Sequence, residues 1–103
     1  MSLNITIQIV IFMSSTQNSQ LKEVKCFYEN GNPSEHEFYQ DNKLEGKRQE
    51  WFKNGDIRIE EFYERGIREG RRKTWYRNGQ LQSQAFYRDG GVMEAISFGT
   101  KTE

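Results

Sequence analysis

The segment that decides the fold is Trp51-Phe52-Lys53-Asn54-Gly55, because two near-copies of it recur at a constant distance. Phe27-Tyr28-Glu29-Asn30-Gly31 precedes it by 24 residues, and Trp75-Tyr76-Arg77-Asn78-Gly79 follows it by 24. A second aromatic pair comes eight residues after each Asn, at Phe38-Tyr39, Phe62-Tyr63 and Phe86-Tyr87. A constant period of this length indicates tandem repeats of one supersecondary unit.

Each repeat contains two chain reversals. Asn-Gly between strand-like runs favours a two-residue type I′ hairpin turn, whose central residues both need positive φ. Three such turns are predicted, at Asn30-Gly31, Asn54-Gly55 and Asn78-Gly79. A second reversal follows near Asn42, Gly66 and Gly90. We therefore expect an all-β, single-layer antiparallel sheet of tandem β-hairpins with little or no helix; a short stretch at 19–24 is the exception that the pattern allows.

Two-residue turns would fix the register of each hairpin. Lys53 would then pair with Asp56, Phe52 with Ile57, and Trp51 with Arg58. One face would carry Tyr28, Phe52, Tyr76, Pro33, Ile57, Leu81, Tyr39, Tyr63 and Tyr87. The other would carry Phe27, Trp51, Trp75, Phe38, Phe62 and Phe86, with Lys73, Arg71 and Arg77 beside Trp75. Since both faces hold aromatic residues, either the sheet curls or one face binds a partner.

The length of 103 residues predicts a single domain. We divide it into an N-terminal strand and degenerate capping segment (1–25), three repeats (26–94) and a C-terminal tail (95–103). Residues 5–9 alternate with period two, which favours a strand over an export signal or an expression scar. The apolar stretch is too short to span a bilayer. The segments 5–12 and 92–98 could cover the open edges of the sheet or form a homodimer through them.

These recurring positions resemble the MORN-repeat variant, whose units read aromatic-aromatic-x-Asn-Gly and then Tyr-x-x-Gly-x-x-x-Gly. The second spacing is present at Tyr63, Gly66 and Gly70, whereas Asn42 replaces the first glycine in one unit and Glu94 the last in another. The resemblance covers 26–94. It implies an open, elongated sheet of hairpins without catalytic residues. It also implies roles in scaffolding, dimerisation, antitoxin-like protein binding, or phospholipid binding and membrane attachment.

The sequence offers little for catalysis. His36 is the only histidine and Cys26 the only cysteine. In the predicted register Cys26 pairs with Glu35, and these two side chains point away from the face of His36. One histidine and one cysteine are too few for a metal site, and neither phosphate-binding glycine motif occurs. We therefore predict no catalytic residue, no metal and no cofactor.

Charge is balanced over the whole chain but not along it. There are 15 basic and 15 acidic residues in total, yet 65–88 contains 7 basic residues and 1 acidic residue. The basic cluster consists of Arg65, Arg68, Arg71, Arg72, Lys73 and Arg77. It could pair with the acidic neighbouring unit, for example through Arg72 opposite Glu50 or Glu61. It could instead attract anionic phospholipids or an acidic protein. Single-stranded nucleic acid is disfavoured.

These observations predict a non-catalytic interaction module, a scaffold or antitoxin-like protein, that binds a protein partner through its aromatic face. The candidate binding residues, for a partner or for anionic head groups, are Trp51, Trp75, Arg65, Arg68, Arg71, Arg72, Lys73 and Arg77. The alternative is a peripheral membrane adaptor that binds anionic phospholipids through the basic third repeat. We expect a cytoplasmic location, with membrane-peripheral and exported locations as alternatives.

Overall fold

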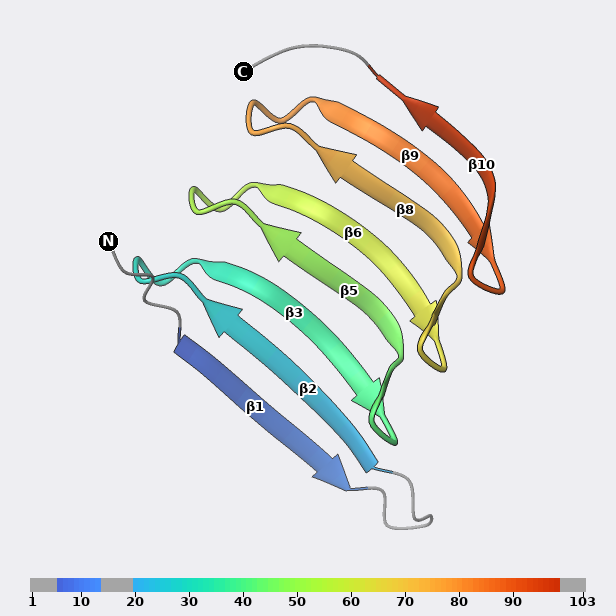
Figure 1. The fold of residues 1–103 in the computed structure, drawn as a ribbon. Helices are drawn as coiled ribbons and strands as arrows, with labels where there is room; N and C mark the ends of the chain where they lie inside the picture. The colour runs from blue at the N-terminus through green and yellow to red at the C-terminus, as the bar shows by residue number, and fades with distance from the viewer. Residues whose placement is uncertain (1–5, 14–19, 99–103) are drawn as a thin grey trace.

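A computed structural model describes residues 6–13 and 20–98. Every regular element in these two ranges is a β-strand, and the strands form one antiparallel sheet (Figure 1). The predicted all-β, single-layer architecture is therefore confirmed. The described part of the stretch at 19–24, which the sequence allowed to be helical, belongs to a strand instead, because it pairs with the strands on both sides.

Eight strands follow one another across the sheet in chain order. They are β1 (Thr6–Met13), β2 (Gln20–Phe27), β3 (Pro33–Gln40), β5 (Gly46–Trp51), β6 (Ile57–Glu64), β8 (Gly70–Trp75), β9 (Leu81–Arg88) and β10 (Gly91–Ser97). Two short strands, β4 (Lys43–Leu44) and β7 (Ile67–Arg68), pair with β3 and β6 at the second reversal of a repeat. The outermost described strands are β1 and β10, so 95–97 of the predicted tail are strand.

The Asn-Gly turns are three-residue loops, so the predicted two-residue turns are wrong. The Phe52 amide donates to the Asp56 carbonyl at 2.8 Å, and the Gly55 amide donates to the Phe52 carbonyl at 3.0 Å. Gly55 has a φ of 99°, a region that favours glycine. Asn54 accepts the Asp56 amide at 2.9 Å through its side chain. The same bonds recur in the first and third repeats.

Two-residue turns with positive φ occur at the other reversal instead. Asp41 and Asn42 have φ of 52° and 69°, and the equivalent pairs Arg65-Gly66 and Asp89-Gly90 also have positive φ. Both central residues being left-handed is the signature of a type I′ turn. Each repeat therefore has a three-residue loop at one end of its strands and a two-residue type I′ turn at the other.

One extra residue after each Asn-Gly loop restores the register. Trp51 lies opposite Ile57 but Glu50 lies opposite Ile59, so Arg58 forms a β-bulge. The predicted pairs of Trp51 with Arg58, Phe52 with Ile57 and Lys53 with Asp56 are therefore wrong. Phe27 and Trp75 likewise face Pro33 and Leu81, which moves Pro33, Ile57 and Leu81 to the tryptophan side. Beyond the bulge the predicted pairing holds, with Cys26 opposite Glu35.

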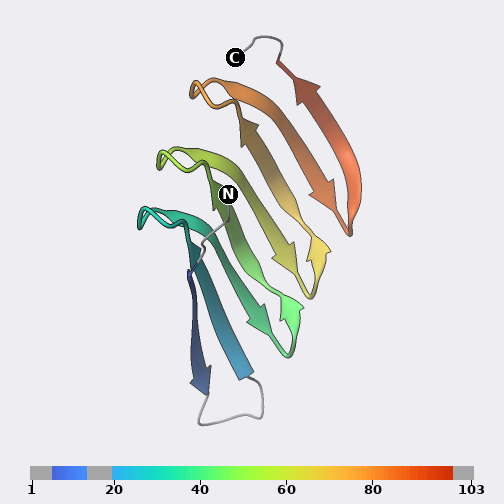
Figure 2. The ribbon, with the colours of Figure 1, turned by 60° about the vertical axis from the view of Figure 1, so that its left-hand side comes forward.

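The two faces differ in burial. We call the side that carries Arg48 and Glu61 the charged face, and the side that carries Trp51 and Trp75 the Trp face. On the charged face Glu61 is 3 % exposed, whereas Phe86 on the Trp face is 37 % exposed. A single layer can bury side chains on one side by curving around them, and the strands bend along their length (Figure 2). The radius of gyration of 15.5 Å exceeds the roughly 13 Å of a compact chain of this size.

Candidate functional site: a charge ladder and an arginine groove

A row of alternating charges crosses the charged face. Arg48 lies opposite Glu61, and Arg72 lies opposite Ala85, in the hairpins of the second and third repeats. Glu37 stands beside Arg48, and Glu61 beside Arg72, where neighbouring repeats meet. Glu37, Glu61 and Ala85 are spaced by 24 residues, as are Arg48 and Arg72. This charge ladder ends in an alanine where the third repeat would supply its carboxylate.

Arg48 is surrounded by carboxylates. Its guanidinium contacts Glu50 at 2.6 Å, Glu37 at 2.8 Å, Glu61 at 3.0 Å and Glu35 at 3.2 Å. Burial alone would lower the pKa of Arg48, but its contacts with Glu50 and Glu37 outweigh burial and raise the pKa above its ordinary value. Charge-assisted hydrogen bonds of this kind lock the side chain in place, so Arg48 has a structural role.

Glu61 is 3 % exposed, the lowest value among the buried residues of 21–98, and three arginines compensate its charge. Arg72 donates at 2.9 Å, Arg48 at 3.0 Å and Arg68 at 3.2 Å, and the Tyr63 hydroxyl donates at 3.1 Å. Burial raises the pKa of Glu61, but the hydrogen bond from Arg72, the charge of Arg68 and the Tyr63 hydroxyl together hold the pKa below 4.5. The carboxylate is therefore ionised at neutral pH.

Arg72 has far fewer partners than Arg48. Arg48 pairs with four carboxylates, whereas Arg72 has one ion pair among the described residues, with Glu61. Three positions account for the difference, since Ile59, Thr74 and Ala85 replace Glu35, Glu50 and Glu61 of the preceding repeat. The charged face is therefore acidic around Arg48 and basic around Arg72.

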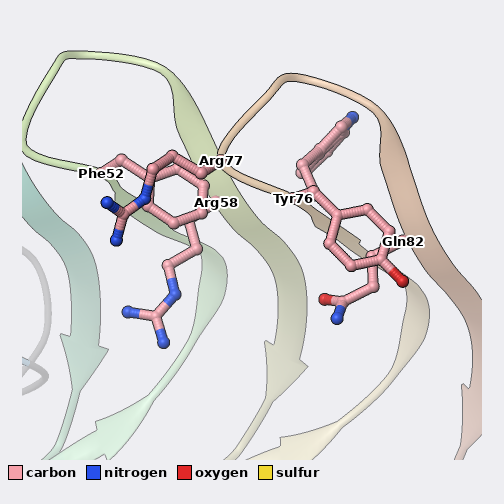
Figure 3. Close-up of a pocket in the computed structure, with 6 residues that line it drawn as sticks. Phe52, Arg58, Tyr76, Arg77 and Gln82 are labelled. Carbon is pink, nitrogen blue, oxygen red and sulfur yellow. The ribbon is translucent and has the colours of Figure 1, made fainter. Parts of the chain in front are cut away.

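Two adjoining hollows open on the basic half of the charged face, and we call them together the arginine groove. The first has a volume of about 590 Å³ and is lined by Phe52, Arg58, Trp75, Tyr76, Arg77 and Gln82 (Figure 3). The second, of about 400 Å³, shares Arg58 with it and reaches Arg72, Thr74, Ser83 and Ser97. Three arginines line the groove, and its described lining contains no carboxylate.

Phe52 holds two of these arginines at the mouth of the groove. The guanidinium carbons of Arg58 and Arg77 lie 5.7 Å and 5.8 Å from its ring centroid, an arrangement visible in Figure 3. Cation–π contacts at such distances orient a guanidinium while leaving its donors accessible. Arg58 is 51 % exposed, and its ion pair with Glu50 is long, at 3.6 Å. Arg77 was predicted to flank Trp75; the two residues line the same hollow, and the guanidinium of Arg77 turns toward Phe52.

A family model of the MORN repeat variant matches residues 20–41, 44–65 and 68–89. These three segments cover more than half of the chain. The chain belongs to the MORN repeat variant family. Comparisons with curated proteins and with solved structures found no match. MORN repeats are generally non-catalytic interaction or binding modules. The matched segments begin at residue 20 and end at 89, whereas the sequence-based division placed the repeats at 26–94.

The third MORN repeat holds most of the predicted binding residues but divides them between its two faces. Arg71 and Lys73 alternate with Arg72 along β8, so they lie on the Trp face with Trp75. The guanidinium of Arg71 sits 5.5 Å from the ring centroid of Phe86. Trp51 and Trp75 are the last residues of β5 and β8 and are half-buried. The Trp face thus keeps two of the six predicted basic residues.

The remaining basic residues of the cluster lie elsewhere. Arg68 and Arg72 pair with Glu61 on the charged face, which confirms the expectation that the cluster meets the acidic neighbouring repeat. Arg65 sits in a turn, where its amide donates to Glu45 at 2.8 Å. The sequence reasoning missed Arg58, because its place on the charged face depends on a bulge that has no signature in composition or spacing.

The residues considered for catalysis stand apart in this MORN protein. Cys26 lies opposite Glu35 on the charged face, whereas His36 contacts Glu23 and Phe38 on the Trp face. Burial, followed by the charges of Glu35 and Glu37, raises the pKa of the Cys26 thiol, which makes it a poor nucleophile. Within residues 20–98 no three His, Cys, Asp or Glu side chains converge as metal ligands. No helix long and apolar enough to cross a membrane occurs in the described ranges.

Proposed function

We propose that this MORN protein is a non-catalytic interaction module, a scaffold or antitoxin-like protein, that binds a protein partner at the C-terminal end of its sheet. The observation that carries the proposal is the exposure of β10, the last strand of the described sheet. All seven of its residues are exposed, and Met93, Val92 and Ile96 are 61 %, 55 % and 44 % exposed. An open strand edge offers backbone donors and acceptors to a partner strand.

The composition of β10 supports this proposal. Edge strands that must stay unpaired usually carry lysine or proline, and β10 contains neither. Glu94 is its one charged residue. Ile96 lies opposite Gln84, whose side chain shares the Trp face with Lys73 and Phe86. The apolar rim of the edge is therefore continuous with the Trp face, where Trp75 remains a proposed contact.

Binding to anionic phospholipids is the second candidate, and Arg71 and Lys73 beside Trp75 are the observation that favours it. A flat bilayer meets one face of a sheet at a time. Each basic residue near the surface contributes about 1 kcal/mol of attraction to anionic lipid, so this pair contributes about 2 kcal/mol. That is a weak anchor for a whole protein, which makes a protein partner the stronger proposal.

The test is affinity capture from the native host with the full chain and two matched variants. Ile96→Lys places a charge in the rim of β10, whereas Ile67→Lys places the same charge at a residue that is 48 % exposed on β7, which pairs with β6 and is not part of the edge strand. We expect the wild type and Ile67→Lys to retain one specific partner and Ile96→Lys to lose it. Equal capture by both variants would count against the edge.

Vesicle flotation distinguishes binding to anionic phospholipids, the second candidate, from binding to a protein partner. We expect no flotation with neutral vesicles and little with anionic ones. Strong flotation with anionic vesicles that disappears at high salt and in an Arg71→Gln, Lys73→Gln variant would favour the membrane adaptor instead.

A further inference from the structure

The second and third repeats present the same arginine in different surroundings. Arg48 is 17 % exposed and uses its Nε and both terminal nitrogens on carboxylates. Arg72 is 26 % exposed, and its described hydrogen bond is from Nε to Glu61 at 2.9 Å. The terminal nitrogens of Arg72 make no described contact with a carboxylate. Arg72 is therefore fixed through Nε, while its two terminal nitrogens can donate hydrogen bonds to an anion.

Ala85 marks where that anion would lie. It faces Arg72 directly across the β8–β9 hairpin, as Glu61 faces Arg48 across the β5–β6 hairpin. Ala85 thus supplies no carboxylate to Arg72, and the hollow that reaches this arginine lies toward Thr74 and Ser83. Because β8 and β9 keep the register of β5 and β6, a carboxylate placed over Ala85 would meet Arg72 as Glu61 meets Arg48.

The walls of the groove suit an anion. Thr74 stands where the preceding repeat has Glu50, and its hydroxyl lies 2.7 Å from that of Ser83. Both hydroxyls and Arg58 line the hollow that reaches Arg72. The volume of this hollow, about 400 Å³, lies within the range of small-ligand sites. This hollow therefore brings together the guanidinium groups of Arg58 and Arg72, and its described lining contains no carboxylate, although each arginine keeps one ion pair outside it, with Glu50 and Glu61 respectively.

We infer that this groove binds a carboxylate side chain of an extended acidic peptide, which completes the charge ladder over Ala85. The internal precedent is a carboxylate borne by a strand, since Glu61 fills the same place in the second repeat. A Glu or Asp can form paired hydrogen bonds with Arg72, and Arg58 is placed for a second acidic residue. The inference rests on the proposed function to the extent that the peptide belongs to a protein partner.

The test measures fluorescence anisotropy of a labelled decapeptide of alternating Glu and Ser against the full chain. A Gln-Ser decapeptide is the neutral probe. Ala85→Glu supplies the missing carboxylate from within, so we expect it to weaken binding at least about tenfold and to raise the melting temperature. Arg58→Gln is the second variant, at a well-exposed residue, and it should weaken binding without altering the melting temperature.

Gln84→Glu is the matched control. It adds the same charge one residue away on the same strand, but on the Trp face opposite Lys73. We expect it to change affinity less than about threefold, because the added carboxylate lies on the opposite face of the sheet from Arg72 and faces Lys73. Equal weakening by Gln84→Glu and Ala85→Glu would reduce the effect to general electrostatics and overturn the inference.

Two further outcomes would also overturn it. One is equal binding of the Glu-Ser and Gln-Ser peptides. The other is binding to anionic vesicles, sensitive to Ala85→Glu, without binding to the acidic peptide, which would assign the groove to lipid phosphate. Ile96 lies opposite Gln84 on the Trp face and does not line the groove, so a failure of the groove and a failure of the proposed function remain distinguishable.

Discussion

Glu61 joins the second and third repeats through contacts with three arginines. At 3 % exposure it is nearly inaccessible to water, and it is the described ion-pair partner of Arg68 and Arg72 and one of four carboxylates around Arg48. Removing one partner of a buried charge pair is more destabilising than the pair is stabilising, because the other charges stay buried without compensation. A polar network therefore takes the place of an apolar core in this sheet.

Replacing Glu61 tests that role. We expect Glu61→Gln, which keeps the shape of the side chain, to lower the free energy of unfolding by about 3 kcal/mol at neutral pH. Urea denaturation followed by circular dichroism measures the change. Glu35→Gln is the control, because Glu35 also contacts Arg48, at 3.2 Å, but is 38 % exposed. A loss for Glu61→Gln no larger than that for Glu35→Gln would contradict the assigned role.

The same two carboxylates give opposite pH dependences. The pKa of Glu61 is held below 4.5, so its contribution to stability is present above that pH and is lost as pH falls through its folded pKa. Burial, with the charge of Glu37, raises the pKa of Glu35, so its contribution is present below pH 4.5 and is lost as pH rises through the folded pKa. Denaturation between pH 2 and 7 should therefore show a smaller loss on acidification in Glu61→Gln than in the wild type.

At the scale of the elements, the sequence predicted hairpins in the correct phase but assigned the wrong turn type to Asn-Gly. That dipeptide suits a two-residue type I′ turn and also a three-residue loop that ends in a left-handed glycine. The choice depends on whether Phe52 bonds to Asp56, which the local sequence does not determine. The bulge at Arg58 then offsets the longer loop, so the pairing of Cys26 with Glu35 was predictable although the turn was not.

The loop glycines give a prediction at this scale. Gly79 has a φ of 93° with open space where a Cβ would lie, whereas Gly91 has no positive φ and would meet the Arg88 carbonyl at an ordinary 3.7 Å. We expect Gly79→Ala to cost about 1 kcal/mol, because an alanine there is strained. Gly91→Ala should be close to neutral. Melting curves of the two variants measure the difference, and equal losses would argue against a left-handed Gly79.

At the scale of the whole molecule, each strand depends on its immediate neighbours. Within residues 21–98 Cys26 is the one buried apolar side chain, at 9 % exposure, so no common apolar core couples distant strands from β2 to β10. Stability in such arrays is close to a sum over units and their interfaces. The candidate groove could not be predicted from the sequence. Its defining feature is the carboxylate missing at Ala85, and only the sheet register shows that Arg72 lies opposite this residue.

Hydrogen exchange should reveal this local coupling. We expect amides of β6 to exchange slowest, since β6 is paired on both sides and carries Glu61. Amides of β10 should exchange fastest among β2 to β10, because one edge of β10 is open in the described sheet. Mass spectrometry of exchanged peptides measures the gradient. Uniform protection from β2 to β10 would instead mean that the sheet opens as a single unit.

The charge ladder ends at Ala85, where the third repeat lacks the glutamate of the first two. The proposed binding site therefore lies in whichever repeat lacks this glutamate. Neighbouring strands lie about 4.8 Å apart, so each two-strand repeat advances the ladder by about 10 Å. In a longer array, an alanine at this position in one chosen repeat would place a receptor for an acidic residue at a set distance along the ribbon. Single substitutions would therefore set the spacing between binding sites along the sheet.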